Sequence, residues 1–132
     1  KTDIINNIRN TYDYKVNYFC KNNSKNNVVI ISIDSNTIDI LSNILQHLDI
    51  NITNNLKKNV INSDNYNIIC IYYYNRFYIS NWEKIDKIII WDISRDSKEY
   101  QQIINYINQQ IVSITKQFIK LENYTNNFNI LV

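Results

Sequence analysis

The sequence holds no glycine and no proline in its 132 residues, and it holds no alanine either. Glycine is the residue that enters left-handed backbone conformations without steric cost. Its absence excludes glycine loops that cradle phosphates, dinucleotide-binding turns and the nucleophile elbow of hydrolases. Because every codon for glycine, alanine and proline begins with two G or C letters, the joint absence also indicates an AT-rich gene.

Length and composition favour one folded domain. A chain of 132 residues can bury a real core, and 45 % of the residues are hydrophobic. The net charge of +2 predicts no strong electrostatic footprint and excludes neither nucleic acid nor protein as a partner. No apolar run is long enough to span a membrane, and no basic leader precedes an apolar segment. We expect a single domain over residues 1–132, with a lead-in segment at 1–27 and a core at 28–132, in the cytoplasm.

The few cysteine and histidine residues argue against a metal site. Cys20 and Cys70 stand among aromatic and branched apolar neighbours, which favours two buried free thiols in a reducing compartment over a disulfide. His47, the one histidine, lies in a helical pattern with no cysteine or second histidine near it. We therefore predict no metal ligand of these types and no cofactor.

The segment from Val28 to Leu48 predicts a strand, a tight loop and a helix. The run Val28–Ile33 is almost continuously apolar and β-branched, as expected of a strand buried on both faces. Asp34 follows at a position suited to cap a helix. The apolar residues that come next recur at helical spacing. They are Ile38, Leu41, Ile44, Leu45 and Leu48.

Further elements alternate in the same way along the chain. The runs Ile68–Tyr74 and Ile85–Ile93 predict two more buried strands. A helix capped by Ser94 or Asp96 follows. Its apolar stripe consists of Ile103, Ile104, Ile107, Ile111 and Ile114.

Weaker patterns predict three shorter elements. They are a strand at Asp49–Ile52, a helix at Asn54–Ile61 and a last strand at Phe128–Val132. Uniformly apolar strands that alternate with amphipathic helices predict an α/β fold with three layers, in which helices flank a mostly parallel sheet. Asparagine pairs mark the loops and are expected to replace glycine in left-handed turns. The pairs are Asn22-Asn23, Asn26-Asn27, Asn54-Asn55 and Asn126-Asn127.

From Val28 onward, the order of elements resembles the C-terminal RecA-like lobe of a superfamily 2 helicase. The segments that carry the resemblance read NVVIISIDSNTIDILSNILQHL, DINITNNLKKNVI, NIICIYYY and KIIIWDIS. Within this superfamily, the pattern is most similar to the Swi/Snf-like, poxvirus nucleoside triphosphatase type. The resemblance implies a RecA-like lobe that belongs to a viral or plasmid transcription or replication assembly.

The chain departs from this family at the positions where catalysis occurs. A glycine-containing loop of the family is replaced by Asn75-Arg76-Phe77-Tyr78. Aligning Gln102-Ile103-Ile104 with the family's Q-I-I motif places Tyr106 and Gln109 at its two arginines. Neither residue carries the positive charge that stabilises a transferring phosphoryl group. The resemblance therefore implies a degenerate lobe without catalytic residues.

Aromatic and basic residues are the candidates for binding. The run Tyr72-Tyr73-Tyr74 with Arg76, Phe77 and Tyr78 is typical of a platform that stacks nucleobases, of a patch for a protein partner, or of core packing. Trp82 lies in a polar loop, where an exposed indole would anchor an interface, whereas Trp91 is expected in the core. The site residues that we predict for a protein partner or nucleic acid are Arg76, Phe77, Trp82, Lys84 and Arg95.

Three functions stay open on the sequence alone. The leading hypothesis is a non-catalytic helicase-like scaffold that binds a protein partner and, in addition, nucleic acid. The second is a small Mg²⁺-dependent nucleotide-binding or phosphoryl-transfer enzyme, in which Asp34 and Asp92 at two strand ends hold the metal. The same two aspartates are more typical of helix and turn caps. The third is a purely structural interaction domain.

Overall fold

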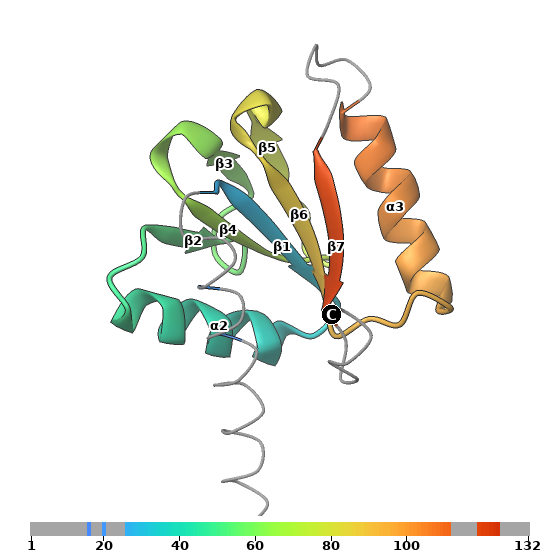
Figure 1. Cartoon of the computed structure of the whole chain (residues 1–132), viewed down its shortest axis with the longest axis horizontal. Coiled ribbons are helices and arrows are strands. Elements are labelled where there is room, and N and C mark those ends of the chain that lie inside the picture. The colour runs from blue at the N-terminus through green and yellow to red at the C-terminus, as the bar shows by residue number, and fades with distance from the viewer. Residues whose placement is uncertain (1–15, 17–19, 21–25, 112–118, 125–132) are drawn as a thin grey trace, which may run out of the picture.

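The computed structural model describes residues 16, 20, 26–111 and 119–124. In this part of the chain, strands and helices alternate along most of the sequence (Figure 1). The elements are β1 (Val28–Ser32), α2 (Ser35–His47), β2 (Ile52–Asn54), β3 (Val60–Asn62), the 3₁₀ turn η1 (Ser63–Asn65), β4 (Ile68–Tyr72), β5 (Tyr78–Ser80), the 3₁₀ turn η2 (Trp82–Lys84), β6 (Lys87–Trp91), α3 (Lys98–Ile111) and β7 (Lys120–Tyr124).

The strands form two sheets in which every pairing is parallel. The main sheet has five strands in the order β2-β4-β1-β6-β7, and β3 pairs with β5 in a separate two-stranded sheet. Parallel strands of one sheet need long crossovers, which α2 provides between β1 and β2 and α3 between the neighbouring strands β6 and β7. The predicted α/β class with a mostly parallel sheet is confirmed.

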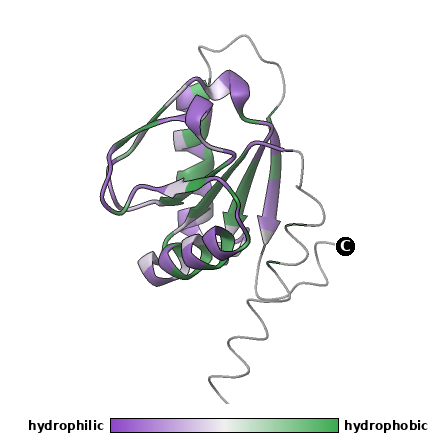
Figure 2. Cartoon of the chain, turned by 90° about the vertical axis from the view of Figure 1, so that its left-hand side faces the viewer, coloured by the Kyte–Doolittle hydropathy of each residue, from purple (hydrophilic) through white to green (hydrophobic). Residues whose placement is uncertain are grey.

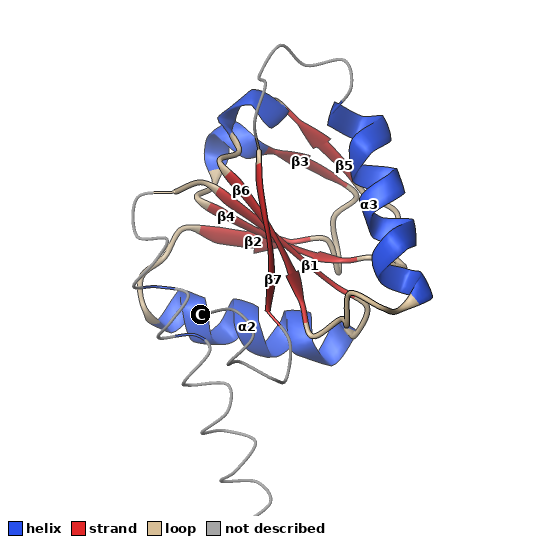
Figure 3. Cartoon of the chain, turned by 45° about the vertical axis from the view of Figure 1, so that its right-hand side comes forward, coloured by secondary structure: helices blue, strands red, loops and turns tan. Residues whose placement is uncertain are grey.

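Both faces of the main sheet are buried under apolar layers, which gives the three predicted layers. Along β1, Val28 and Ile30 face the cluster under α2, and Val29 and Ile31 face the cluster under α3. The two helices cover opposite faces (Figure 3), and the hydrophobic colouring concentrates on the central strands between them (Figure 2). Because the central strands β1, β4 and β6 are buried on both faces, they have continuous apolar sequences.

Trp91 fills the α2 side of the sheet and is fully buried, as its sequence context predicts. Cys70 is buried on the same side, and burial raises the pKa of its thiol to about 12. Cys20 is a half-buried free thiol that packs at the edge of this cluster. Two free thiols agree with the preferred reading of the sequence.

The start of α2 follows the predicted pattern. The Asp34 backbone is extended, and its carboxylate accepts hydrogen bonds from the Asn36 N–H at 3.0 Å and from the Thr37 hydroxyl at 3.2 Å. These bonds satisfy a donor that the first helical turn leaves without a partner. The buried face of the helix carries Ile38, Leu41 and Leu45.

The cap of α3 differs from the predicted one. The Ser97 hydroxyl accepts from the Tyr100 N–H at 3.1 Å, directly before the helix begins at Lys98. Ser94, which was a predicted cap, instead accepts from the Asp96 N–H and shapes the preceding turn. Ile103 and Ile107 are buried by the helix, and Ile114 lies outside the described residues.

Two predicted short elements are displaced or wrong. The strand expected at Asp49–Ile52 is β2, which begins only at Ile52. The helix expected at Asn54–Ile61 is wrong, since the chain bends and then enters β3. Asn54 accepts from the Leu56 N–H through its side chain at 3.0 Å, and such local bonds compete with helix formation.

The sequence pattern did not reveal β5, which lies in a predicted loop, or β7. The strand predicted at Phe128–Val132 lies outside the described residues. The residues with left-handed backbone conformations also differ from expectation. In the described part of the chain they are Asp49, Asn81 and Asp92, with φ of 58°, 62° and 58°. The asparagine pairs that the structure describes are not among them. Aspartate and asparagine thus share the role predicted for asparagine.

No helix in the described ranges has both the length and the apolar character that crossing a bilayer requires.

The capping bonds of Asp34 predict a measurable effect on stability. Asp34→Ala is expected to lower the free energy of unfolding by about 1 kcal/mol, whereas Asp34→Asn keeps a capping side chain and loses only a few tenths. Asp39→Ala, an exposed position within the same helix, is the control. Urea unfolding followed by circular dichroism measures all three. An equal effect of Asp34→Ala and Asp39→Ala would contradict the role of the cap.

Candidate functional site

The carboxyl ends of the five parallel strands lie along one edge of the main sheet. The crossover from β1 leads towards β2, and the crossover from β6 leads the opposite way to β7, although β1 and β6 are neighbours. In open α/β sheets, ligands bind beside such a reversal, outside the carboxyl ends of the strands. This geometry directs attention to the loops that follow β1, β4 and β6.

A pocket with aromatic walls lies just beyond the carboxyl end of β4. Its volume is about 450 Å³, within the range of roughly 300–1,000 Å³ that is typical of small-molecule sites. Five of its lining residues come from the loop between β4 and β5, and one comes from α3. We call it the aromatic pocket, and it is lined by Tyr73, Tyr74, Asn75, Arg76, Phe77 and Tyr106.

The aromatic rings meet at steep angles. Tyr73 contacts Tyr74 at a centroid distance of 5.5 Å and Tyr106 at 6.2 Å, with interplanar angles of 62° and 86°. Phe77 and Tyr106 are 5.1 Å apart at 59°. Edge-to-face and tilted pairs of this kind are favourable contacts that hold the rings in place.

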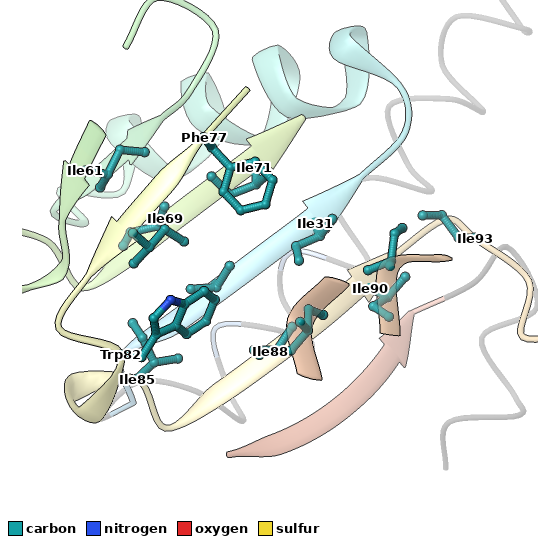
Figure 4. Close-up of a cluster of buried hydrophobic side chains, with 14 residues drawn as sticks. Ile31, Ile61, Ile69, Ile71, Phe77, Trp82, Ile85, Ile88, Ile90 and Ile93 are labelled. Carbon is teal, nitrogen blue, oxygen red and sulfur yellow. The ribbon is translucent and has the colours of Figure 1, made fainter. Parts of the chain in front are cut away.

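The predicted aromatic group is divided between the core and the surface. Phe77 is only 8 % exposed and packs in the cluster under α3, where Figure 4 shows it beside Ile71. Tyr74 is 57 % exposed, and Arg76 beside it is exposed as well. Phe77 therefore anchors the loop, and Tyr74 and Arg76 are the members that a partner can reach.

Asn55 fixes the loop that carries the pocket. Its side chain is 1 % exposed and donates to the carbonyl oxygens of Tyr72 at 2.9 Å and Asn75 at 3.3 Å. The same amide accepts from the Tyr72 N–H at 2.7 Å. On the sequence alone, Asn55 is one residue of an asparagine pair that marks a loop. Its polarity at a buried position is visible only once the fold brings residues 55 and 72 together.

Tyr106 joins the pocket from α3. Its hydroxyl lies 3.4 Å from the Phe77 carbonyl oxygen, to which it donates. Burial raises the pKa of Tyr106, and interaction with Tyr73 raises it further. The phenol thus stays protonated and neutral at physiological pH. This is the position at which the helicase-like pattern would place an arginine.

The other predicted site residues do not gather around the aromatic pocket. Arg95 is exposed on the loop after β6. Lys84 is exposed in η2, before β6, and lies 4.0 Å from the Asp64 carboxylate. Lys84 therefore lies near the amino end of β6. Arg76 and Arg95 instead lie beyond the carboxyl ends of β4 and β6.

Trp82 is not an exposed interface anchor. It is 5 % exposed and belongs to the apolar cluster under α3, where Figure 4 shows it near Ile85. Its polar sequence neighbours are exposed, and the indole turns into the core beneath them. The indole N–H has no hydrogen-bond partner among the described residues. Trp82 also lines a second pocket of about 440 Å³ with Tyr78, Ile79, Asn81, Glu83, Gln109 and Gln110.

Asp34 and Asp92 follow adjacent strands, as the alternative magnesium site requires. Both carboxylate oxygens of Asp34 are engaged in capping α2. Asp92 is half-buried in the left-handed conformation. No group of three or more histidine, cysteine, aspartate or glutamate side chains able to hold a metal ion occurs within the described ranges. For Asp34, the capping interpretation is confirmed.

Comparisons with protein-family models, curated proteins and solved structures return no match to this chain.

The bonds of Asn55 predict that this residue holds the aromatic loop in place. Asn55→Ala is expected to lower the free energy of unfolding by about 2 kcal/mol, because it leaves polar groups of the loop without partners. Asn59→Ala, at an exposed position on the same connection, is the control and is expected to change it by less than about 0.5 kcal/mol.

Urea unfolding measures the stability of both variants, and hydrogen exchange of the Tyr72 amide reports on the loop itself. If Asn55→Ala left this exchange rate unchanged, the clamping role of Asn55 would be wrong.

Proposed function

We propose that this chain is a non-catalytic binding module of helicase-like ancestry that acts as a scaffold in a viral or plasmid transcription or replication assembly. The proposal joins the resemblance in the order of elements with the parallel α/β fold. The module holds its partner at the carboxyl edge of the main sheet, where Tyr74 and Arg76 are accessible. A protein partner is the first occupant that we expect, with nucleic acid as an additional contact.

The observation that carries the proposal is the aromatic pocket. Exposed aromatic side chains and arginine are enriched where proteins bind other molecules, and here they stand together beside a concave surface. Asn55 and Tyr106 hold the loop from two directions. A loop fixed in this way loses little conformational entropy on binding.

The non-catalytic part of the proposal is supported by the chemistry of two α3 residues. Tyr106 lines the aromatic pocket and Gln109 lines the second pocket, at the positions where the helicase pattern has arginines. A phenol and an amide donate hydrogen bonds without a positive charge, so neither supplies the charge stabilisation on which phosphoryl transfer depends. The capping bonds also give Asp34, one of the two carboxylates of the magnesium alternative, a structural role that needs no metal.

A hydrolysis assay tests the absence of catalysis. With ATP or GTP and Mg²⁺, the full chain is expected to release no phosphate above the buffer blank, and Mg²⁺ is expected to leave its melting temperature unchanged. Asp34→Asn and Asp92→Asn serve as charge-removing variants, and the first keeps the helix cap. Phosphate release that falls in these variants would establish the magnesium enzyme instead.

A co-purification experiment tests the binding surface. A tagged full chain, expressed in the cells from which its gene comes, is expected to retain a partner that the double variant Tyr74→Ala/Arg76→Gln loses. Tyr78→Ala is the matched control, because Tyr78 is also 57 % exposed but lines the second pocket instead. Equal retention of the partner by all forms would place the binding surface elsewhere.

A further inference from the structure

The aromatic pocket combines flat apolar walls, one cation and one free amide within about 450 Å³. We propose that this pocket binds a nucleotide, with the base against the tyrosine rings and the phosphate at Arg76. The inference rests on the proposed function, because it names the chemistry of a ligand for the same surface.

An exposed tyrosine gives a flat ligand a surface on which to stack. The edge-to-face contacts of Tyr73 with Tyr74 and Tyr106 fix the orientation of the rings. A base can therefore stack on the part of an aromatic ring that is open to solvent. Tyr74 is 57 % exposed, so its ring is the accessible wall. Bases of every kind have a π face, which makes such stacking tolerant of sequence.

The charge of the pocket favours an anion. Arg76 is the single charged residue among the lining residues, and no carboxylate is among them. A guanidinium presents a planar set of donors that matches two phosphate oxygens at once. The ligand should thus carry an aromatic ring and a negative charge within a few ångströms of each other, as a nucleotide does.

Asn75 adds a polar contact that suits the edge of a base. Its backbone is fixed by bonds to Tyr72 and Asn55, but its side-chain amide makes no hydrogen bond within the described part of the chain. An asparagine amide presents a donor and an acceptor side by side, which matches the polar edge of a base such as adenine. The ring of a phenylalanine side chain has no such polar edge.

A nucleotide can come from two sources, a free mononucleotide or a single-stranded nucleic acid. The test uses the full chain at low salt with two probes. AMP binding is followed by calorimetry, and binding of a fluorescein-labelled oligoadenylate is followed by anisotropy over a range of salt concentrations. Circular dichroism melting confirms that each variant is folded.

Matched variants localise the binding. Tyr74→Ala is expected to weaken binding at least about 5-fold, the lower end of what stacking of one base contributes. Arg76→Gln is expected to weaken oligonucleotide binding and to reduce the slope of log K against log salt by about 0.7. Tyr78→Ala and Lys58→Gln are the controls, since Tyr78 lines the second pocket and Lys58 is exposed and bonds to the Tyr66 hydroxyl.

The outcomes separate the sources and the alternatives. Pocket-dependent binding of AMP supports a free nucleotide, and pocket-dependent binding of the oligonucleotide alone supports a nucleotide within a strand. The inference is overturned if neither probe binds, or if Tyr74→Ala binds as tightly as the unaltered chain. Such a result would still be compatible with a scaffold that binds a protein partner. Phosphate release in the hydrolysis assay, by contrast, would contradict the non-catalytic scaffold but not the nucleotide site.

Discussion

The structure depends on the burial of the main sheet on both faces. A parallel sheet cannot close with short hairpins, so each return of the chain has to cross over a face and cover it. Helices α2 and α3 do this on opposite faces, and the apolar side chains of β1, β4 and β6 fill the layers between. The same arrangement brings every strand of the main sheet to its carboxyl end at one edge. The same parallel arrangement therefore buries the core and places the candidate site.

Polar side chains at that edge replace what glycine does in other α/β proteins. Asp92 takes a left-handed conformation directly after β6, and Asp34 caps α2 directly after β1. Asn55 ties the loop after β4 through three hydrogen bonds. A buried amide that bonds to backbone groups holds a loop more firmly than a flexible glycine does. Moving the loop would leave buried donors and acceptors without hydrogen bonds, which costs free energy. The absence of glycine therefore leads to loops held by side chains, and such loops are sensitive to single substitutions.

The fold can be predicted from regular hydrophobic patterns in the sequence. The site can be predicted only in part, because it depends on contacts between residues that are far apart in the sequence. The runs that became β1, β4 and β6 are buried on both faces, so the sequence alone indicates them. The two short strands β3 and β5 each bury one isoleucine, Ile61 or Ile79, between exposed or half-buried neighbours. This pattern is too brief to stand out within a polar segment. Arg76 and the tyrosine run were visible as chemistry, but the burial of Trp82 and the contribution of Tyr106 depend on packing between distant segments.

The position of α3 connects the core with the chemistry of the pocket. Ile103 and Ile107 bury one stripe of the helix, and this fixes its rotation over the sheet. Tyr106 lies beside that stripe and reaches the aromatic pocket, and Gln109 lies further along and reaches the second pocket. Because residues three apart in a helix lie on neighbouring parts of its surface, one helix presents a different side chain to each pocket. A change in the packing of Ile107 would therefore move the wall of the aromatic pocket, although Ile107 does not line it. The shape of this pocket thus depends on the same isoleucines that stabilise the fold.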